Sequence, residues 1–261
     1  MGERTSYTPG TFCWTDLTTP DQETAKAFYS GLFGWEAEDI PVGEGVFYSM
    51  QRLGGRDVAA ISPQPQQQRE AGLPPMWNSY VAVPDADAAL ARARELGANV
   101  HAEAFDVFDS GRMGVVQDPQ GAFFMVWQAK DHAGAGLVNA HGALSWDELY
   151  TPDLDAGARF YEGLFGWTTQ PMEGMEGMEM PYRIVQTEAG RSNGGITTME
   201  GVPPSWLVYF GTDDMKRSVA QAGELGAETR MGPMDIGVGS IAVLTDPQGA
   251  TFALYAGRFE D

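Results

Sequence analysis

The sequence predicts an α+β protein in which four strand-helix-three-strand (βαβββ) modules form two fused domains. Three observations support this fold class. The chain repeats itself over nearly its whole length, each half passes through strand-like and helix-like patterns in the same order, and both halves end on the turn sequence DPQG before a last strand.

The repeat is clearest near the start of each half. Residues 12–35 and 144–167 align without a gap and agree at 12 of 24 positions, including the ending GLFGW. A second match pairs the segments that begin at Trp77 and Trp206, and a third pairs the two DPQGA runs. Because the order is preserved and the spacing changes only from 132 to 128, the sequence indicates that the whole half was duplicated.

The first module begins with residues 14–19, which alternate as a half-buried strand does. Residues 20–34 place apolar side chains at helical spacing, with Asp21 as the expected N-cap and Gly34 as the residue that ends the helix. Three short strands separated by glycine- and proline-containing turns are then expected at 35–40, 46–53 and 57–63.

The second module is predicted to follow a proline- and glutamine-rich loop at residues 63–75. It restarts with a strand at 77–83 and continues with a helix whose apolar face comprises Ala89, Leu90, Ala93 and Leu96. In its DPQG turn, proline suits the first corner and glycine the last position. The glycine- and alanine-rich residues 131–142 read as a linker, which gives a first domain at 8–130 and a second at 143–258.

The composition narrows the class of partner. Thirty-six acidic against sixteen basic residues give a net charge of −20, which repels a phosphate backbone, so we expect no nucleic-acid partner. The sequence lacks a run of about 18 apolar residues and an apolar secretory stretch at its start, so we expect no membrane association and a cytoplasmic protein. The single cysteine, Cys13, fits a reducing compartment.

The element order, together with FYSGLFGW, FYEGLFGW and the two DPQG turns, resembles the vicinal oxygen chelate superfamily of glyoxalase I, bleomycin-resistance proteins and extradiol dioxygenases. The chain is most similar to fused two-domain members described as glyoxalase-like or hydroxylase-like. The resemblance implies that the two fused domains are glyoxalase-like with curved mixed sheets. In each domain two modules curl into a half-open cup, with helices on the convex side and the ligand on the concave side. Isomerases, lyases, dioxygenases and drug-sequestering proteins share this cup, so the fold alone does not give the function.

Catalytic members of the family usually hold a divalent metal with His, Gln or Glu on the inner strand faces. Carried onto this sequence, those positions are Trp14, Trp146, Asn78, Leu207, Met125 and Ala253. None of these residue types is a normal ligand for a catalytic divalent metal. We therefore expect no metal and no other cofactor, and we do not expect metal-dependent glyoxalase or dioxygenase activity.

The alternation of strand side chains predicts what faces each cup instead. The expected first set is Phe12, Trp14, Asp16, Thr18, Asn78, Tyr80, Phe123, Met125 and Trp127, and the second is Leu144, Trp146, Glu148, Leu207, Tyr209, Thr251 and Tyr255. Trp77 and Trp206 fall on the outward phase and are expected in the core against the helices. Each cup then becomes an aromatic box with one carboxylate on its first strand.

The candidate catalytic residues are Asp16 and Glu148. The candidate ligand-binding residues are Trp14, Asn78, Tyr80, Arg112, Met125, Trp127, Trp146, Tyr209 and Tyr255. Arg112 has no basic counterpart in the second half, so either one cup is active or Arg112 is a surface residue. The methionine-rich residues 171–181 read as an adaptable lid or as a plain loop.

Such boxes suit a small planar or cationic molecule, because indole and phenol rings stack on flat rings and attract cations. The leading hypothesis is a metal-independent glyoxalase-fold protein that binds a small aromatic or cationic molecule. One alternative is a lyase, isomerase or hydroxylase-like enzyme that uses Asp16 or Glu148 as general base, because burial raises the pKa of a carboxyl group. Another is an interaction protein whose cups are filled by their own side chains. We expect a monomer or a weak homodimer.

Overall fold

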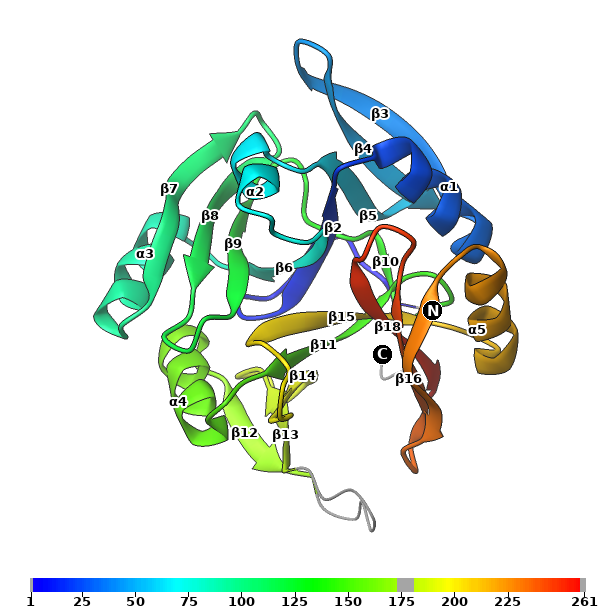
Figure 1. Cartoon of the computed structure of the whole chain (residues 1–261). Helices are drawn as coiled ribbons and strands as arrows, with labels where there is room; N and C mark the ends of the chain where they lie inside the picture. Colours follow the sequence, from blue (N-terminus) through cyan, green and yellow to red (C-terminus); the bar gives the residue numbers. More distant parts are fainter. Residues whose placement is uncertain (1, 173–180, 259–261) are drawn as a thin grey trace.

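The computed structural model describes residues 2–172 and 181–258 and consists of two eight-stranded mixed sheets (Figure 1). The strand order is β3-β4-β5-β2-β6-β9-β8-β7 in the first sheet and β12-β13-β14-β11-β15-β18-β17-β16 in the second. Each sheet is thus built from two modules that meet at their first strands. The α+β class and the four βαβββ modules are confirmed.

The first sheet and its helices follow the predicted order. The elements are β2 (Phe12–Thr19), α1 (Gln22–Phe33), β3 (Glu36–Gly43), β4 (Val46–Leu53), β5 (Arg56–Pro63), β6 (Met76–Ala82), α3 (Ala86–Glu95), β7 (Asn99–Val107), β8 (Gly111–Gln117) and β9 (Phe123–Ala129). A short helix, α2 (Gln66–Glu70), lies within the segment predicted to be a loop. Pro65 stands at its N-cap with φ −54°, and residues with good helix propensity follow, which explains the difference.

The second sheet repeats this plan. Its elements are β11 (Leu144–Tyr150), α4 (Leu154–Phe165), β12 (Thr168–Pro171), β13 (Tyr182–Gln186), β14 (Ser192–Thr197), β15 (Ser205–Gly211), α5 (Met215–Glu224), β16 (Glu228–Asp235), β17 (Gly239–Thr245) and β18 (Thr251–Gly257). The proposed lid overlaps residues 173–180, which lie outside the described residues. Two short strands, β1 (Gly2–Glu3) and β10 (Leu137–Val138), pair with each other, so the predicted linker contains a strand.

Helix ends follow the predicted signals. The Asp21 carboxylate accepts a hydrogen bond from the backbone N–H of Thr24, and Gly34 ends α1 in the left-handed conformation at φ 73°. At α4, the Asp153 side chain accepts from the backbone N–H of Ala156, and Gly166 ends the helix in the left-handed conformation at φ 69°. In Figure 1, α1 and α5 lie together on one flank, α3 and α4 lie on the other, and the concave faces of the two sheets open away from each other.

The two halves interlock through equivalent hydrogen bonds. The indole N–H of Trp35 donates to the carbonyl of Gly142, and that of Trp167 donates to the carbonyl of Gly10, both at 2.7 Å. The outward prediction for Trp77 is confirmed, since its indole donates to the hydroxyl of Tyr29 on α1, and Trp206 contacts Tyr161 on α4 in the same way. Each half therefore completes the packing of the other.

A bulge corrects one prediction about the first cup. The pairing of β2 with β6 shifts between Phe12 and Trp14, which adds a residue and changes the face of the strand. The Phe12 ring instead packs against Trp167 and Trp206, with ring centroids 5.5 and 4.8 Å away, in the interface between the domains. The strand β11 has the same irregularity between Leu144 and Trp146. Within the described residues, no helix has the length and apolar character needed to cross a bilayer.

Candidate functional site

The floor of the first cup is a hydrogen-bonded cluster around Asp16 of β2. Asn78 donates its side-chain amide to one carboxylate oxygen at 2.7 Å. The hydroxyls of Tyr48 and Tyr80 donate to the other at 3.0 and 2.8 Å. The indole N–H of Trp14 in turn donates to the hydroxyl of Tyr48 at 2.9 Å. The strand register explains the assembly, because Asp16 pairs directly with Asn78 and Trp14 with Tyr80.

The floor of the second cup repeats the cluster around Glu148 of β11. The hydroxyl of Tyr209 donates to Glu148 at 3.0 Å, and the indole of Trp146 donates to the hydroxyl of Tyr182 at 3.0 Å. Hydrogen bonds from Tyr150 and Tyr182 also act on the carboxyl group. Leu207 stands where the first cup has Asn78, so tyrosines supply the donors here.

Burial dominates the electrostatics of both floors. It raises the pKa of Asp16 and of Glu148 above their ordinary values, while the hydrogen bonds from amide and tyrosine groups oppose the rise. The pKa of Tyr48 is raised well above its ordinary value, first by burial and then by the nearby Asp16. The pKa values of Tyr80, Tyr182 and Tyr209 are raised for the same reasons, by burial and then by Asp16 or Glu148. These phenols therefore stay protonated and donate to the carboxyl groups across the physiological pH range.

Sequence reasoning missed several members of these clusters. Tyr48 and Tyr182 lie on β4 and β13, strands whose phase toward the cup depends on sheet pairing. A usable signal was present, because the two tyrosines stand 134 positions apart, close to the repeat spacing. His132, assigned to the linker, lies edge-on to Trp14 with ring centroids 4.6 Å apart, and its buried Nε2 has no hydrogen-bond partner within the described part of the chain.

The other predicted ligand-binding residues are placed as follows. Tyr80 of β6 pairs with Met125 of β9, and the Trp127 ring lies 6.4 Å from the Tyr80 ring, so these three share the concave face of the first sheet. In the second sheet, Trp146 and Tyr255 are half-buried and pack against the apolar cluster that contains Tyr209. Their roles in binding a ligand stay predictions.

The structure corrects the prediction that Arg112 is a ligand-binding residue of the first cup. It is paired with Gln128 in the sheet, and Gln128 bonds the start of α3 on the convex side. Its guanidinium makes two hydrogen bonds, of 2.8 and 3.0 Å, to Asp87 of α3. Because adjacent strand residues point to opposite faces, Met113 faces the cup and Arg112 does not. The surface-arginine alternative is the right one.

The walls of the first cup leave large apolar side chains in contact with solvent. Phe105 of β7 pairs with Met113, which pairs with Trp127, so all three share the concave face. Phe123 lies two residues before Met125 on the same strand and on the same face. Phe105 is 46% exposed and Phe123 is 37% exposed. The cup thus combines a buried polar floor with an exposed apolar wall.

The donor set of the cups does not fit a divalent catalytic metal. At the first-strand position of each half, an indole N–H donates to a tyrosine hydroxyl and offers no lone pair. The carboxyl group of Asp16 already accepts three hydrogen bonds. Across residues 2–172 and 181–258, His, Cys, Asp and Glu side chains form no group of three or more that could hold a metal ion.

Two family models match the chain. The model described as the glyoxalase/bleomycin resistance protein/dioxygenase superfamily matches residues 11–126, and a model described as a glyoxalase-like domain matches residues 144–255. The chain belongs to this superfamily. The duplication that the sequence revealed is therefore a fusion of two glyoxalase-like domains, each containing one carboxyl cluster.

Superfamily members with similar sequences span nearly the whole chain. A Mycobacterium bovis protein named "Putative glyoxylase CFP32" is 44% identical over 257 residues, which cover 97% of each chain. The anthracycline biosynthesis protein DnrV of Streptomyces peucetius is 34% identical over 262 residues, covering 96% of this chain and 94% of that one.

Solved structures of the superfamily share the fold. The Mn(II)-bound glyoxalase from Novosphingobium aromaticivorans has a TM-score of 0.65 at 18% identity, covering 95% of this chain and 82% of that one. A variant of homoprotocatechuate 2,3-dioxygenase from B. fuscum has a TM-score of 0.67 at 17% identity, covering 99% and 74%. At such identities the likeness concerns the fold alone.

Proposed function

We propose that this glyoxalase-fold protein binds a flat aromatic small molecule in its cups without the help of a divalent metal. The observation that supports this most directly is the first cup, where a buried tyrosine–carboxyl floor adjoins a wall of exposed Phe105 and Phe123. Large apolar side chains exposed on a concave surface are typical of ligand-binding surfaces.

The chemistry of the floor favours an aromatic over a cationic ligand. The Asp16 carboxyl is 4% exposed, has a raised pKa and already accepts three hydrogen bonds, so it offers little free charge to a cation. Ring stacking contributes about 0.5–1.5 kcal/mol per pair beyond the burial of area. The name of the relative DnrV, an anthracycline biosynthesis protein, supports a ligand with fused flat rings.

The test is a calorimetric titration with an anthraquinone, a monocyclic phenol and a cationic dye of similar size, with and without EDTA. We expect the anthraquinone to bind, EDTA to leave the affinity unchanged, and a Phe105→Ala/Phe123→Ala double variant to bind at least fivefold more weakly, as the loss of two stacking contacts implies. Phe108→Ala is the matched control, because Phe108 is 68% exposed and follows the end of β7. An unchanged affinity in the double variant, or loss of binding in EDTA, would refute the proposal.

A second candidate function is catalysis, in which Asp16 or Glu148 acts as general base on a bound aromatic or carbonyl compound. The raised pKa of both buried carboxyl groups favours it, because a general base works best when its pKa lies near the working pH. Turnover by an Asp16→Asn/Glu148→Gln variant at the wild-type rate would exclude both residues from the mechanism.

A further inference from the structure

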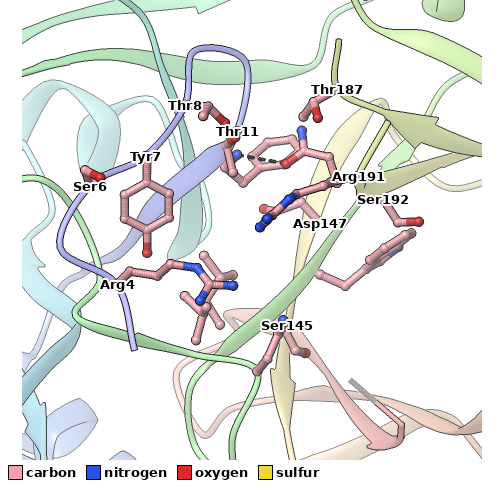
Figure 2. A pocket seen from close by; sticks show the side chains of 16 residues that line it. Arg4, Ser6, Tyr7, Thr8, Thr11, Ser145, Asp147, Thr187, Arg191 and Ser192 are labelled. Atoms are coloured by element: carbon pink, nitrogen blue, oxygen red, sulfur yellow. Dashed lines mark hydrogen bonds between the residues drawn. The ribbon is translucent and has the colours of Figure 1, made fainter. Parts of the chain in front are cut away.

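A pocket of about 220 Å³ lies where the segment before β2 meets the second domain. Its walls come from that segment, from the start of β11 and from the chain around the start of β14 (Figure 2). We propose that this pocket binds a small aromatic carboxylate, at a site that shares Trp146 with the second cup but is not lined by Glu148 or Tyr209. Charge, an unpaired hydroxyl and a comparison of the two halves support the inference independently.

Two arginines make the pocket attractive to an anion. Arg4 approaches from the N-terminal segment and Arg191 from the turn before β14. Figure 2 shows both side chains extending toward the middle of the pocket, whose lining also includes the hydroxyl-bearing residues Thr11, Ser145 and Ser192. A guanidinium group matches a carboxylate with two parallel N–H donors. Two such groups at one pocket stand out in a chain of net charge −20.

A buried hydroxyl in the same pocket lacks a partner. Thr187 is 5% exposed, and its Oγ1 makes no hydrogen bond within the described part of the chain. Leaving such a group unpaired costs about 1–3 kcal/mol, and buried polar atoms are otherwise nearly always satisfied. A carboxylate oxygen in the pocket would accept this hydrogen bond.

The equivalent region of the first half indicates which kind of group would fill the pocket. Asp16 pairs with Ala60 and Glu148 with Gly195, so the start of β14 corresponds to the start of β5. In the first half the chain itself covers this corner. His132 lies edge-on to Trp14, and the backbone N–H of Ala135 donates to the carbonyl of Cys13 at 2.8 Å.

In the second half, the counterparts of Trp14 and Cys13 are Trp146 and Ser145, and both line the pocket. A flat ring bound against Trp146 would occupy the position that the His132 imidazole occupies against Trp14 in the first half. Its carboxylate would then point toward the two arginines. The buried Asp147 also lines the pocket. Burial raises its pKa to about 7 and its carboxyl accepts the hydroxyl of Ser79 at 2.5 Å, so it does not act as a fully ionised neighbour that would repel the ligand.

The experiment is a calorimetric titration of the full chain with benzoate in phosphate-free buffer, with benzamide as the neutral analogue. We expect saturable binding of benzoate, at least tenfold weaker binding of benzamide, and at least tenfold losses in Arg4→Gln and Arg191→Gln, as the loss of a charged hydrogen bond implies. Arg69→Gln on α2 is the matched control, because Arg69 is exposed and does not line the pocket.

Two further variants distinguish this site from the first cup. Thr187→Val keeps the shape of the side chain and should weaken benzoate without lowering the melting temperature, whereas Phe105→Ala/Phe123→Ala should bind benzoate as the wild type does. Absence of benzoate binding, equal binding of benzamide, or wild-type affinity in an Arg4→Gln/Arg191→Gln variant would overturn the inference. None of these results bears on the first cup, because its floor and its apolar wall share no residue with the pocket lining.

Discussion

The buried Asp147 should make the protein less stable as the pH rises from about 4 toward 7. Its side chain lies between the two domains, 1% exposed, and its hydrogen-bond partner is the hydroxyl of Ser79. Burial raises its pKa from an ordinary 3.8 to about 7. The native state therefore binds the proton more tightly than the unfolded chain does, and the free energy of unfolding must fall between pH 4 and pH 7.

The size of the effect follows from the linkage. Each pKa unit corresponds to 1.36 kcal/mol, so a difference of about 3 units is worth about 4 kcal/mol above pH 7. Asp147→Asn keeps an oxygen that can accept from Ser79 and cannot ionise. We expect this variant to match the wild type near pH 4 and to exceed its stability by up to about 4 kcal/mol at pH 8.

Urea denaturation of wild type and variant between pH 4 and pH 8.5 measures this difference directly. All other titrating groups are shared, so the difference between the two curves isolates Asp147. Asp213→Asn, at an exposed position before α5, is the control and should give a small difference with little change over this range. A stability gain in Asp147→Asn that is the same at pH 4 and pH 8 would refute the reasoning.

Three further substitutions probe the interlocked halves and the cup floor, each by thermal or urea unfolding. Tyr29→Phe removes the hydroxyl that bonds both a buried indole and a buried carboxyl group, and should cost about 2 kcal/mol or more. Tyr48→Phe should cost a similar amount, because it breaks two bonds of the first floor at once. Gly142→Ala should destabilise the native state, because Gly142 has φ 70° and the added Cβ would lie 2.9 Å from the Phe33 side chain. For each of the three variants, a free energy of unfolding equal to that of the wild type would contradict the prediction.

The parts of the fold that depend on local pattern were accessible from the sequence. The internal repeat shows two halves, and the order of local patterns within each half predicts its two modules. The helix N-cap at Asp21 is predicted correctly, and the alternation of β2 correctly places Trp14 and Asp16 on one face. These features depend on residues that are close together in the chain, so the pattern of a single sequence is sufficient to predict them.

The features that failed depend on pairing between distant segments. No residue type at positions 12–14 signals the bulge beside Phe12, and the bulge directs the Phe12 ring toward the interface between the domains. Arg112 was assigned without a known register for β8, and the pairing with Gln128 places it on the convex face. His132 falls in the predicted linker, and no local pattern shows that this segment folds back against Trp14.

Comparison of the two halves shows which parts of the floor clusters are shared and which differ. Both retain a carboxyl group that accepts from a tyrosine on the neighbouring first strand, and both retain a tryptophan that donates to a second tyrosine. What differs is the surrounding chemistry, since Asn78 contacts the carboxyl in one half whereas Leu207 occupies the position in the other. We infer that the cluster kept in both copies serves a need common to both cups and that the changed neighbours would set the ligand preference of each proposed binding site. If the two cups bind rings, we therefore expect them to prefer different ones, the first tolerating a polar edge beside Asn78 and the second requiring an apolar edge beside Leu207.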